Sequence, residues 1–277
     1  MLCFGVRQRD RRKQVLTEPR CRHCMSVGGS MMIVPHYYED LDVLHEGTCP
    51  DRAYYIPASR RMDDLVEERE KSDRFQLLNG NWKFRYFESI YDLKESFYRE
   101  DYGAEDFEVV QVPGVWQNYG YDRYQYTNIR YPFAADPPYV PQENPCGAYI
   151  RRFQYQKDAN APRAFLEFEG VDSCFYVWLN GRYLGYSQVS HALSEFEVTD
   201  ALCEGENVLA VLVLKWCDGS YLEDQDKFRM SGIFRDVYLL KRPEQGIFDY
   251  FINTELKGET AILRIRASYL DGAVPIT

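Results

Sequence analysis

NVLAVLVLKW, residues Asn207–Trp216, is apolar at almost every position, whereas a strand with one wet face alternates apolar and polar residues. Such a run predicts a strand that is covered on both faces, at the centre of a sandwich. Earlier in the chain, FYVWLNGRYLGYS (Phe175–Ser187) contains Asn180-Gly181 between two apolar runs, and this pair favours a two-residue hairpin turn. The two stretches together predict antiparallel β structure.

Further stretches on both sides have the two-residue period of half-buried strands. They are NWKFRYF (Asn81–Phe87), GAYIRRFQYQ (Gly147–Gln156), AFLEFEGV (Ala164–Val171), IFRDVYLLKR (Ile233–Arg242) and TAILRIRASYL (Thr260–Leu270). Strands at this spacing with few helical periods predict an all-β fold, a jelly-roll sandwich. The last strand ends seven residues before the end of the sequence, so a second sandwich is only begun.

Composition excludes several classes of protein. The 277 residues carry a net charge of −10, which disfavours a nucleic-acid partner because phosphate binding needs a basic face. No apolar run reaches the roughly 18 residues of a membrane span, and the first residues lack the apolar core of a secretory signal. Eight scattered cysteines without an export signal indicate reduced thiols and a cytoplasmic protein. The CxxC of Cys21 and Cys24 has no second pair to complete a zinc site.

The chain divides into four segments. Residues 1–30 are basic and without hydrophobic periodicity, and we expect a disordered or mis-started leader before a natural start at Met31 or Met32; a basic arm or a targeting peptide is the alternative. Residues 31–72 predict an extended arm, and residues 73–243 the jelly-roll domain. Residues 244–277 are the truncated start of another domain.

Residue chemistry alone gives no catalytic machinery. Glycoside hydrolysis needs two carboxylates that face each other across the scissile bond, roughly 5 Å apart for retention. Glu223, Asp224 and Asp226 lie within four residues on one turn, which favours a solvated or ion-paired loop. The same stretch lacks the spaced ligands of a calcium loop. The four histidines show no ligand spacing, and Ser220 lacks the context of a nucleophile.

Sugar recognition fits two places better. A pyranose offers hydroxyls to a carboxylate or an amide, and a C–H face to an aromatic ring. YTNIRYP (Tyr126–Pro132) places Asn128 between aromatic residues, and WCDGSY places Asp218 after the central apolar run. Both residues are also ordinary turn formers, so a purely structural role remains the alternative for each.

The chain closely resembles the N-terminal region of large β-galactosidases of glycoside hydrolase family 2. The similarity covers roughly Val34 to the end of the sequence. It rests on these stretches, which occur in the same order: LLNGNWKFRYF, VPGVWQNYGYDRYQYTNIRYPF, DPPYVPQENPCGAYIRRF, FEGVDSCFYVWLNGRYLGYSQ, SEFEVTD and WCDGSYLEDQDKFRMSGIFRDVYLL.

The resemblance implies a galactose-binding-like jelly roll at 73–243 and the first strands of an immunoglobulin-like domain at 244–277. The family hydrolyses terminal β-D-galactosides, including lactose, with retention, using two Glu residues on a (β/α)₈ barrel that would follow this sequence. No catalytic residue is therefore carried over. The resemblance implies that Asn128 and Asp218 contact the galactosyl unit and that Ile129 lines the same pocket. It also implies that Asp218 is a sodium ligand whose site the barrel completes, with magnesium bound in the barrel.

Two further implications concern the flanking segments. In the family, the segment that matches residues 34–72 runs along subunit contacts, so a homo-oligomer is expected of the complete enzyme. The acidic residues after Asp218 are expected to hold their loop by pairing with Arg229 or Arg235.

Three functional hypotheses follow. The chain is the N-terminal portion of a β-galactosidase and is inactive alone, or it is a stand-alone galactoside-binding module, or it is a complete enzyme. The lack of opposed carboxylates disfavours the third hypothesis. An unfinished strand with an unpaired edge disfavours the second. We therefore favour the first.

Overall fold

The computed structural model describes residues 33–65, 67–127, 130–223 and 226–271. Residues 33–244 form one unit, and residues 245–271 belong to a second. The all-β prediction is confirmed, since 40% of the described residues are in strands and 7% are in helices. No helix among the described residues is long and apolar enough to cross a membrane.

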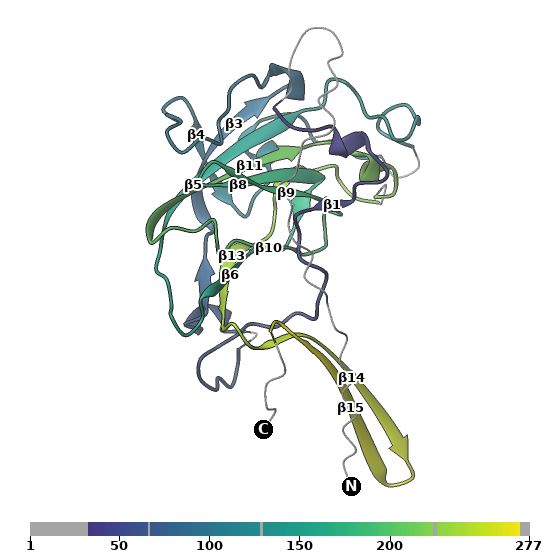
Figure 1. Cartoon of the computed structure of the whole chain (residues 1–277). Coiled ribbons are helices and arrows are strands. Elements are labelled where there is room, and N and C mark those ends of the chain that lie inside the picture. The colour runs from purple at the N-terminus through teal and green to yellow at the C-terminus, as the bar shows by residue number, and fades with distance from the viewer. Residues whose placement is uncertain (1–32, 66, 128–129, 224–225, 272–277) are drawn as a thin grey trace. The chain divides into compact units, whose positions relative to one another are not determined.

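Two antiparallel sheets build the first unit (Figure 1). The larger sheet has seven strands in the order β1-β9-β8-β11-β5-β3-β4, and the smaller has four in the order β10-β6-β13-β2. The strands of the larger sheet are β1 (His45–Glu46), β3 (Gly80–Phe87), β4 (Glu108–Val112), β5 (Cys146–Tyr155), β8 (Cys174–Leu179), β9 (Arg182–Gln188) and β11 (Gly205–Leu214). Those of the smaller sheet are β2 (Phe75–Leu77), β6 (Arg163–Phe168), β10 (Ser194–Glu197) and β13 (Val237–Arg242).

Short elements complete this unit. β7 (Val171–Asp172) pairs with β12 (Gly232–Ile233) outside the two sheets. All its helices within the described residues are single 3-10 turns. They are η1 (Tyr37–Glu39), η2 (Arg69–Lys71), η3 (Ile90–Asp92), η4 (Trp116–Tyr119) and η5 (Asp218–Tyr221).

The central position of β11 explains its uniform apolarity. It lies between β8 and β5 in the larger sheet. Leu209, Val211 and Val213 face the smaller sheet and belong to the core between the sheets. The alternate residues, among them Leu212, belong to a second core on the outer face of the larger sheet. From Val208 to Leu214 the strand is covered on both faces, so no position there lets a polar side chain reach water.

The second core is closed by segments outside the strands. Tyr38, from the N-terminal arm, is 2% exposed within it, and Ile90, Phe97 and Phe107 cover the same face. The arm also adds β1 to the edge of the larger sheet, where His45 pairs with Ser187. Through Tyr38 and β1, the arm is therefore part of this sandwich.

A buried charge cluster fixes the arm to the smaller sheet. Glu167 of β6 and Glu195 of β10 lie directly opposite each other, with Arg242 of β13 beside them. Arg52, from the arm, donates to Glu167 at 2.8 Å and to Glu195 at 2.6 Å. All four side chains are at most 4% exposed. Two guanidinium groups thus lie against two facing carboxyl groups and offset the charge that these groups carry when ionised.

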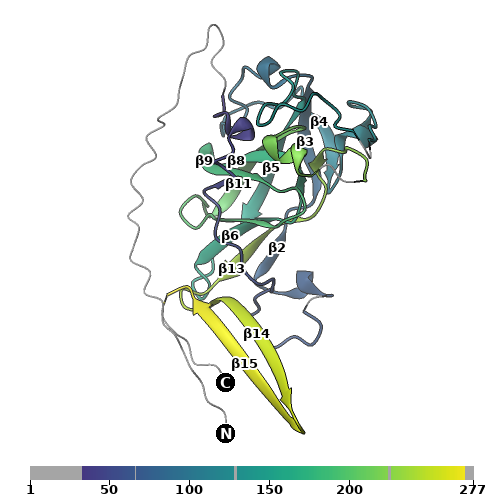
Figure 2. The same ribbon diagram turned by 90° about the vertical axis from the view of Figure 1, so that its right-hand side faces the viewer.

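The predicted hairpin is confirmed, because Asn180 and Gly181 connect β8 to β9 with φ values of 51° and 72°. The single strand predicted over Ile233–Arg242 is wrong in one respect. It is interrupted between β12 and β13, since the N–H groups of Phe234 and Arg235 both donate to the carbonyl oxygen of Gly170. Figure 2 shows β13 beside β6 and β2 in the smaller sheet.

In the second unit, β14 (Ile247–Lys257) and β15 (Thr260–Tyr269) form a hairpin with an irregularity between Ile247 and Asp249. Its turn contains Gly258 at φ 63°, a conformation that suits glycine. The second strand confirms the alternating stretch expected at Thr260–Leu270.

Candidate functional site

The site is built around η5, which begins four residues after the last β11 residue that pairs with β5. Asp218 is its first residue and is 6% exposed. One oxygen of its carboxylate accepts the N–H of Gly219 at 2.8 Å. The same N–H also approaches Oε1 of Gln188 at 3.3 Å, so the end of β9 supports the turn. Asp218 is thus fixed by its own turn and by a neighbouring strand.

The environment of Asp218 is anionic and partly dry. Burial raises the pKa of Asp218, and nearby Asp40 raises it further, while the hydrogen bond with Gln188 opposes the shift. Among the described residues, no Lys, Arg or His side chain forms an ion pair with Asp218. A buried carboxylate without a cation gains stability from hydroxyl donors or from a bound metal ion.

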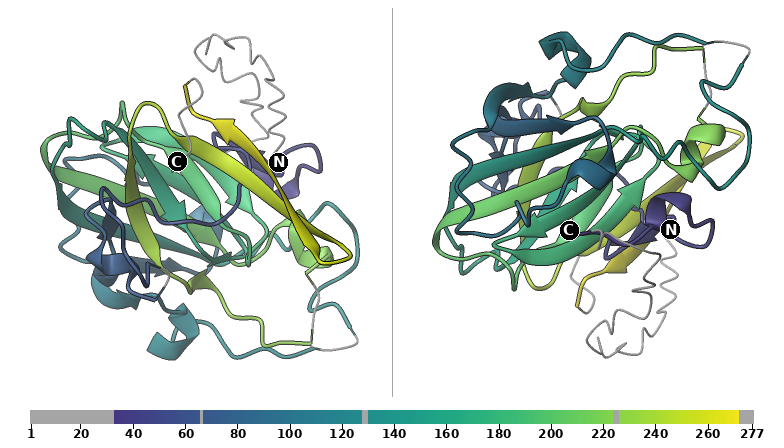
Figure 3. Two further views of the ribbon diagram at one scale, coloured as in Figure 1. Left: turned by 90° about the horizontal axis from the view of Figure 1, so that it is seen from below. Right: turned by 90° about the horizontal axis from the view of Figure 1, so that it is seen from above.

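Asn128 and Ile129 lie outside the described residues, so the structure places neither of them relative to Asp218. The segment that leads to Asn128 is described up to Thr127. It runs beside the segment that leads from Phe228 to Ile233 (Figure 3). The N–H of Trp116 donates to the oxygen of Ser231 at 3.0 Å.

The same pair of segments remains paired toward Asn128. The N–H of Arg229 donates to the oxygen of Gln125 at 2.7 Å, and Tyr126 forms an isolated β-bridge with Phe228. The centroids of the Tyr126 and Phe228 rings lie 5.6 Å apart. The Tyr126 hydroxyl donates to the carboxylate of Asp226. Asn128 is the second residue after Tyr126 in the sequence.

A buried ion pair anchors the base of the ladder. Nζ of Lys215 lies 2.5 Å from Oδ2 of Asp122, and the two side chains are 4% and 10% exposed. Lys215 is three residues before Asp218, and Asp122 is in the segment that leads to Asn128. The amide of Gln117 also donates to Asp122. The pair therefore joins the two segments that carry the predicted sugar-binding residues.

The acidic residues of this loop differ in role. The Glu223 carboxylate accepts hydrogen bonds from Ser190, and Asp226 accepts from Tyr126. Asp224 lies outside the described residues. Arg229 donates to the main-chain oxygen of Glu223, and Arg235 donates to that of His191. Glu223 and Asp226 thus hold the loop, as expected, but their described partners are Ser190 and Tyr126.

Asp218 fits a sodium site as a single ligand. A carboxylate oxygen is the donor that a hard cation prefers, and a cation would relieve the burial of this one. Among the residues the structure describes, no group of three or more His, Cys, Asp or Glu side chains could hold a metal ion. The remaining donors of a sodium site would therefore have to be other than a cluster of described His, Cys, Asp and Glu side chains.

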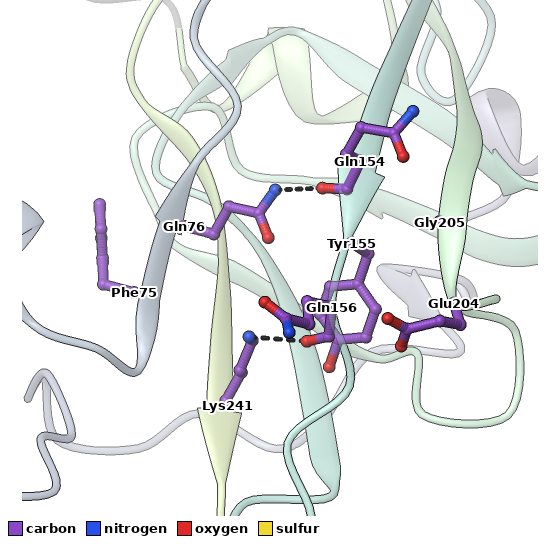
Figure 4. Close-up of a pocket in the computed structure, with 8 residues that line it drawn as sticks. All are labelled: Phe75, Gln76, Gln154, Tyr155, Gln156, Glu204, Gly205 and Lys241. Carbon is purple, nitrogen blue, oxygen red and sulfur yellow. Dashed lines mark hydrogen bonds between the residues drawn. The ribbon is translucent and has the colours of Figure 1, made fainter.

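A groove of about 520 Å³ lies elsewhere on the sandwich, between β2, β5 and β13 (Figure 4). Two of its donors, the Gln76 amide and the Lys241 ammonium, are already engaged. Gln76 donates to the oxygen of Gln154 at 2.7 Å, and Lys241 donates to that of Gln156 at 2.8 Å. Tyr155 is 4% exposed, so it offers no open ring to a sugar. The groove is not the site predicted from the sequence.

Sequence reasoning missed Gln188, Lys215 and the Ser190 contact of Glu223. Their partners are 31 to 145 residues away along the chain. No local pattern in the sequence marks such pairs.

Residues 75–243 match the family model described as "Glycosyl hydrolases family 2, sugar binding domain". Over 244 residues the chain is 50% identical to a β-galactosidase of Actinobacillus pleuropneumoniae. The aligned region covers 88% of this chain and 24% of that protein. It is 45% identical over 229 residues to a β-galactosidase of Staphylococcus xylosus, covering 82% and 22%. The chain thus spans about a quarter of the length of these relatives.

Solved structures share the fold. A Bacteroides uniformis β-glucuronidase superimposes with a TM-score of 0.55 at 20% identity, over 70% of this chain and 22% of that one. A Bifidobacterium dentium β-glucuronidase gives 0.53 at 20% identity, over 72% and 36%. At this identity the likeness supports the architecture alone.

Proposed function

Because the chain belongs to glycosyl hydrolase family 2, we propose that it supplies the galactose-facing wall of a β-galactosidase, an enzyme that hydrolyses terminal β-D-galactosides such as lactose with retention of configuration. The 50% identity to a β-galactosidase over 244 residues is the observation that carries this proposal. A buried carboxylate supports it as well, because Asp218 accepts the N–H of Gly219 in the turn η5.

In this proposal Asp218 and Asn128 orient the sugar, and Ile129 lines the pocket beside them. The Asp218 carboxylate accepts hydrogen bonds from galactosyl hydroxyls, and the Asn128 amide both donates and accepts. Such contacts fix the ring so that the glycosidic bond meets the catalytic groups in a reactive geometry. The two Glu residues that break the bond belong to the catalytic barrel.

Sodium, when bound, would supply a positive charge that favours the ionised form of Asp218. Asp218 is the residue of this chain that would hold it, with barrel residues completing the site. Magnesium is proposed to bind in the barrel.

The proposal includes an organisation for the whole chain. Residues 1–30 would be a leader, 31–72 the arm, 73–243 a jelly-roll sugar-binding domain, and 244–277 the start of an immunoglobulin-like domain. The complete enzyme would be a cytoplasmic homo-oligomer in which the arm also runs along subunit contacts. Its partners are the β-galactoside substrate and the remaining domains of the enzyme.

Two assays test the proposal. The purified 277-residue chain, given a chromogenic β-galactoside, is expected to show no turnover above background, and measurable hydrolysis would refute the assignment of the chemistry to another portion. Residues 34–277 are then joined to the catalytic portion of a family member. In that enzyme Asp218→Asn and Asn128→Ala should each lower kcat/KM by about tenfold or more, on the scale of a hydrogen bond to a charged group. Unchanged values in both variants would disprove the sugar contact.

A further inference from the structure

The Glu223 carboxylate accepts two hydrogen bonds from a buried serine. Oε1 accepts the main-chain N–H of Ser190 at 2.8 Å, and Oε2 accepts its hydroxyl at 2.9 Å. Ser190 is 1% exposed and lies between β9 and β10. The preceding residue, Val189, has φ 73°, which a branched side chain rarely adopts. The two contacts therefore stabilise a loop whose backbone is strained.

The main chain of Glu223 connects to both predicted binding segments. Its N–H donates to the oxygen of Gly219 at 2.9 Å, which closes the turn that begins at Asp218. Its carbonyl oxygen accepts Nη1 of Arg229 at 2.7 Å. Arg229 is 6% exposed, and its own N–H donates to the oxygen of Gln125. Glu223 and Arg229 thus connect the Asp218 turn to the segment that leads to Asn128.

We propose that Glu223 is a positioning residue that holds the Asp218 turn and the Gln125–Tyr126 segment in register by anchoring both to Ser190 of the sandwich. The inference rests on the proposed function and extends it to a residue that does not touch the sugar. The other bonds of Glu223 use its main-chain N–H and its carbonyl oxygen, which do not depend on its side chain. Only the anchor to Ser190 depends on the side chain of Glu223.

The anchor needs two acceptors. An ionised carboxylate offers one oxygen to each Ser190 donor, whereas an amide offers a single oxygen and would direct its NH₂ group at the second donor. Alanine removes both acceptors and leaves the buried N–H of Ser190 without this partner. Glu223→Ala should therefore weaken the anchor to Ser190 more than Glu223→Gln does. Ser190→Ala removes only the hydroxyl contact.

Hydrogen exchange in the 277-residue chain measures the anchor directly. Amides of residues 118–127 and 218–222 are expected to exchange about tenfold faster in Glu223→Ala, the factor expected from losing a hydrogen bond to a charged group. Amides of β5 and β11 should stay protected. Glu244→Ala, at an exposed carboxylate of the same unit, is the matched control. Unchanged exchange in both segments, or equal loss of protection in β5 and β11, would overturn the inference.

Galactose inhibition in the joined enzyme separates this inference from the proposed function. Glu223→Ala should raise the inhibition constant of galactose about tenfold, and Glu223→Gln should restore part of the affinity. If Asp218→Asn and Asn128→Ala weaken inhibition but Glu223→Ala does not, the positioning role fails and the proposed function stands. If none of the three has an effect, the proposed function itself fails.

Discussion

Arg52 and Glu195 lie 143 residues apart in the sequence and meet in the interior, where Nε and Nη2 of the arginine both donate to Oε2 of the glutamate, at 2.9 and 2.6 Å. Arg52 comes from the arm and Glu195 from β10. The same guanidinium also contacts Glu167, and the ring of Tyr55 lies 4.8 Å from its centre. The arm therefore completes the interior of the sandwich, and this fact governs the first two predictions.

Replacing Arg52 should destabilise the sandwich strongly. Arg52→Met leaves two facing carboxylates with one buried cation, and breaking a buried pair in this way costs about 3–5 kcal/mol. Urea unfolding of the 277-residue chain measures the loss. Arg61→Met is the control, because Arg61 is 92% exposed and its replacement should change the free energy of unfolding by less than about 0.5 kcal/mol. Equal effects of the two substitutions would contradict the structure.

The Glu195 carboxylate should make the fold sensitive to acid. Burial opposes its ionisation, but the hydrogen bonds from Glu167 and Arg52 and the charge of Arg242 prevail and lower its pKa from 4.5 to about 2. A lowered pKa gives stability that is present above pH 4.5 and is lost as the pH falls toward 2.

The free energy of unfolding, measured between pH 5 and pH 2 for the wild-type chain and for Glu195→Gln, tests this direction of the pH dependence. The wild-type chain should lose stability on acidification more steeply than the variant, which is less stable at neutral pH. Burial raises the pKa of Glu167, the facing residue, so its contribution has the opposite sign and appears as a loss of stability when the pH rises above 4.5. Parallel pH profiles for the wild type and Glu195→Gln would refute the assignment.

The strained backbone at Val189 predicts a stabilising substitution. Val189→Asn should raise the free energy of unfolding by about 1 kcal/mol, because asparagine tolerates a φ of 73° and valine does not. The site is 39% exposed, so little packing is lost. Val109→Asn is the matched control, since Val109 is an exposed residue of β4 and asparagine is unfavourable in a strand. Thermal unfolding that shows no gain at Val189 would argue against the strain.

The Lys215–Asp122 pair should stabilise the folded sandwich. Lys215→Met leaves Asp122 without its buried cation and is expected to cost about 3 kcal/mol. Adding Asp122→Asn removes the uncompensated charge and should recover most of the loss. The double variant, measured by urea unfolding beside each single variant, gives the coupling energy between the two residues. Additive losses would show that the two side chains do not interact.

Local patterns in the sequence determined the strands. The apolar run of β11, the Asn180-Gly181 turn and the alternation of β3, β5 and β6 each depend on neighbours within a few residues, so their structure follows from side-chain periodicity and turn chemistry. The motifs around Asp218 also carried the family resemblance. The break between β12 and β13 could not be predicted, because it depends on a carbonyl oxygen of Gly170, more than sixty residues earlier.

Only the tertiary structure decided which charges meet. Nothing near Arg52, Glu167, Glu195 or Arg242 in the sequence shows that these four residues share one dry interior, and nothing near Glu223 indicates Ser190. Such contacts depend on strand register and on the path of loops between segments, and a shift of one residue would turn each side chain to the opposite face. The sequence therefore determined where strands form and which family they belong to, while long-range pairing decided how the arm and the Asp218 loop are held.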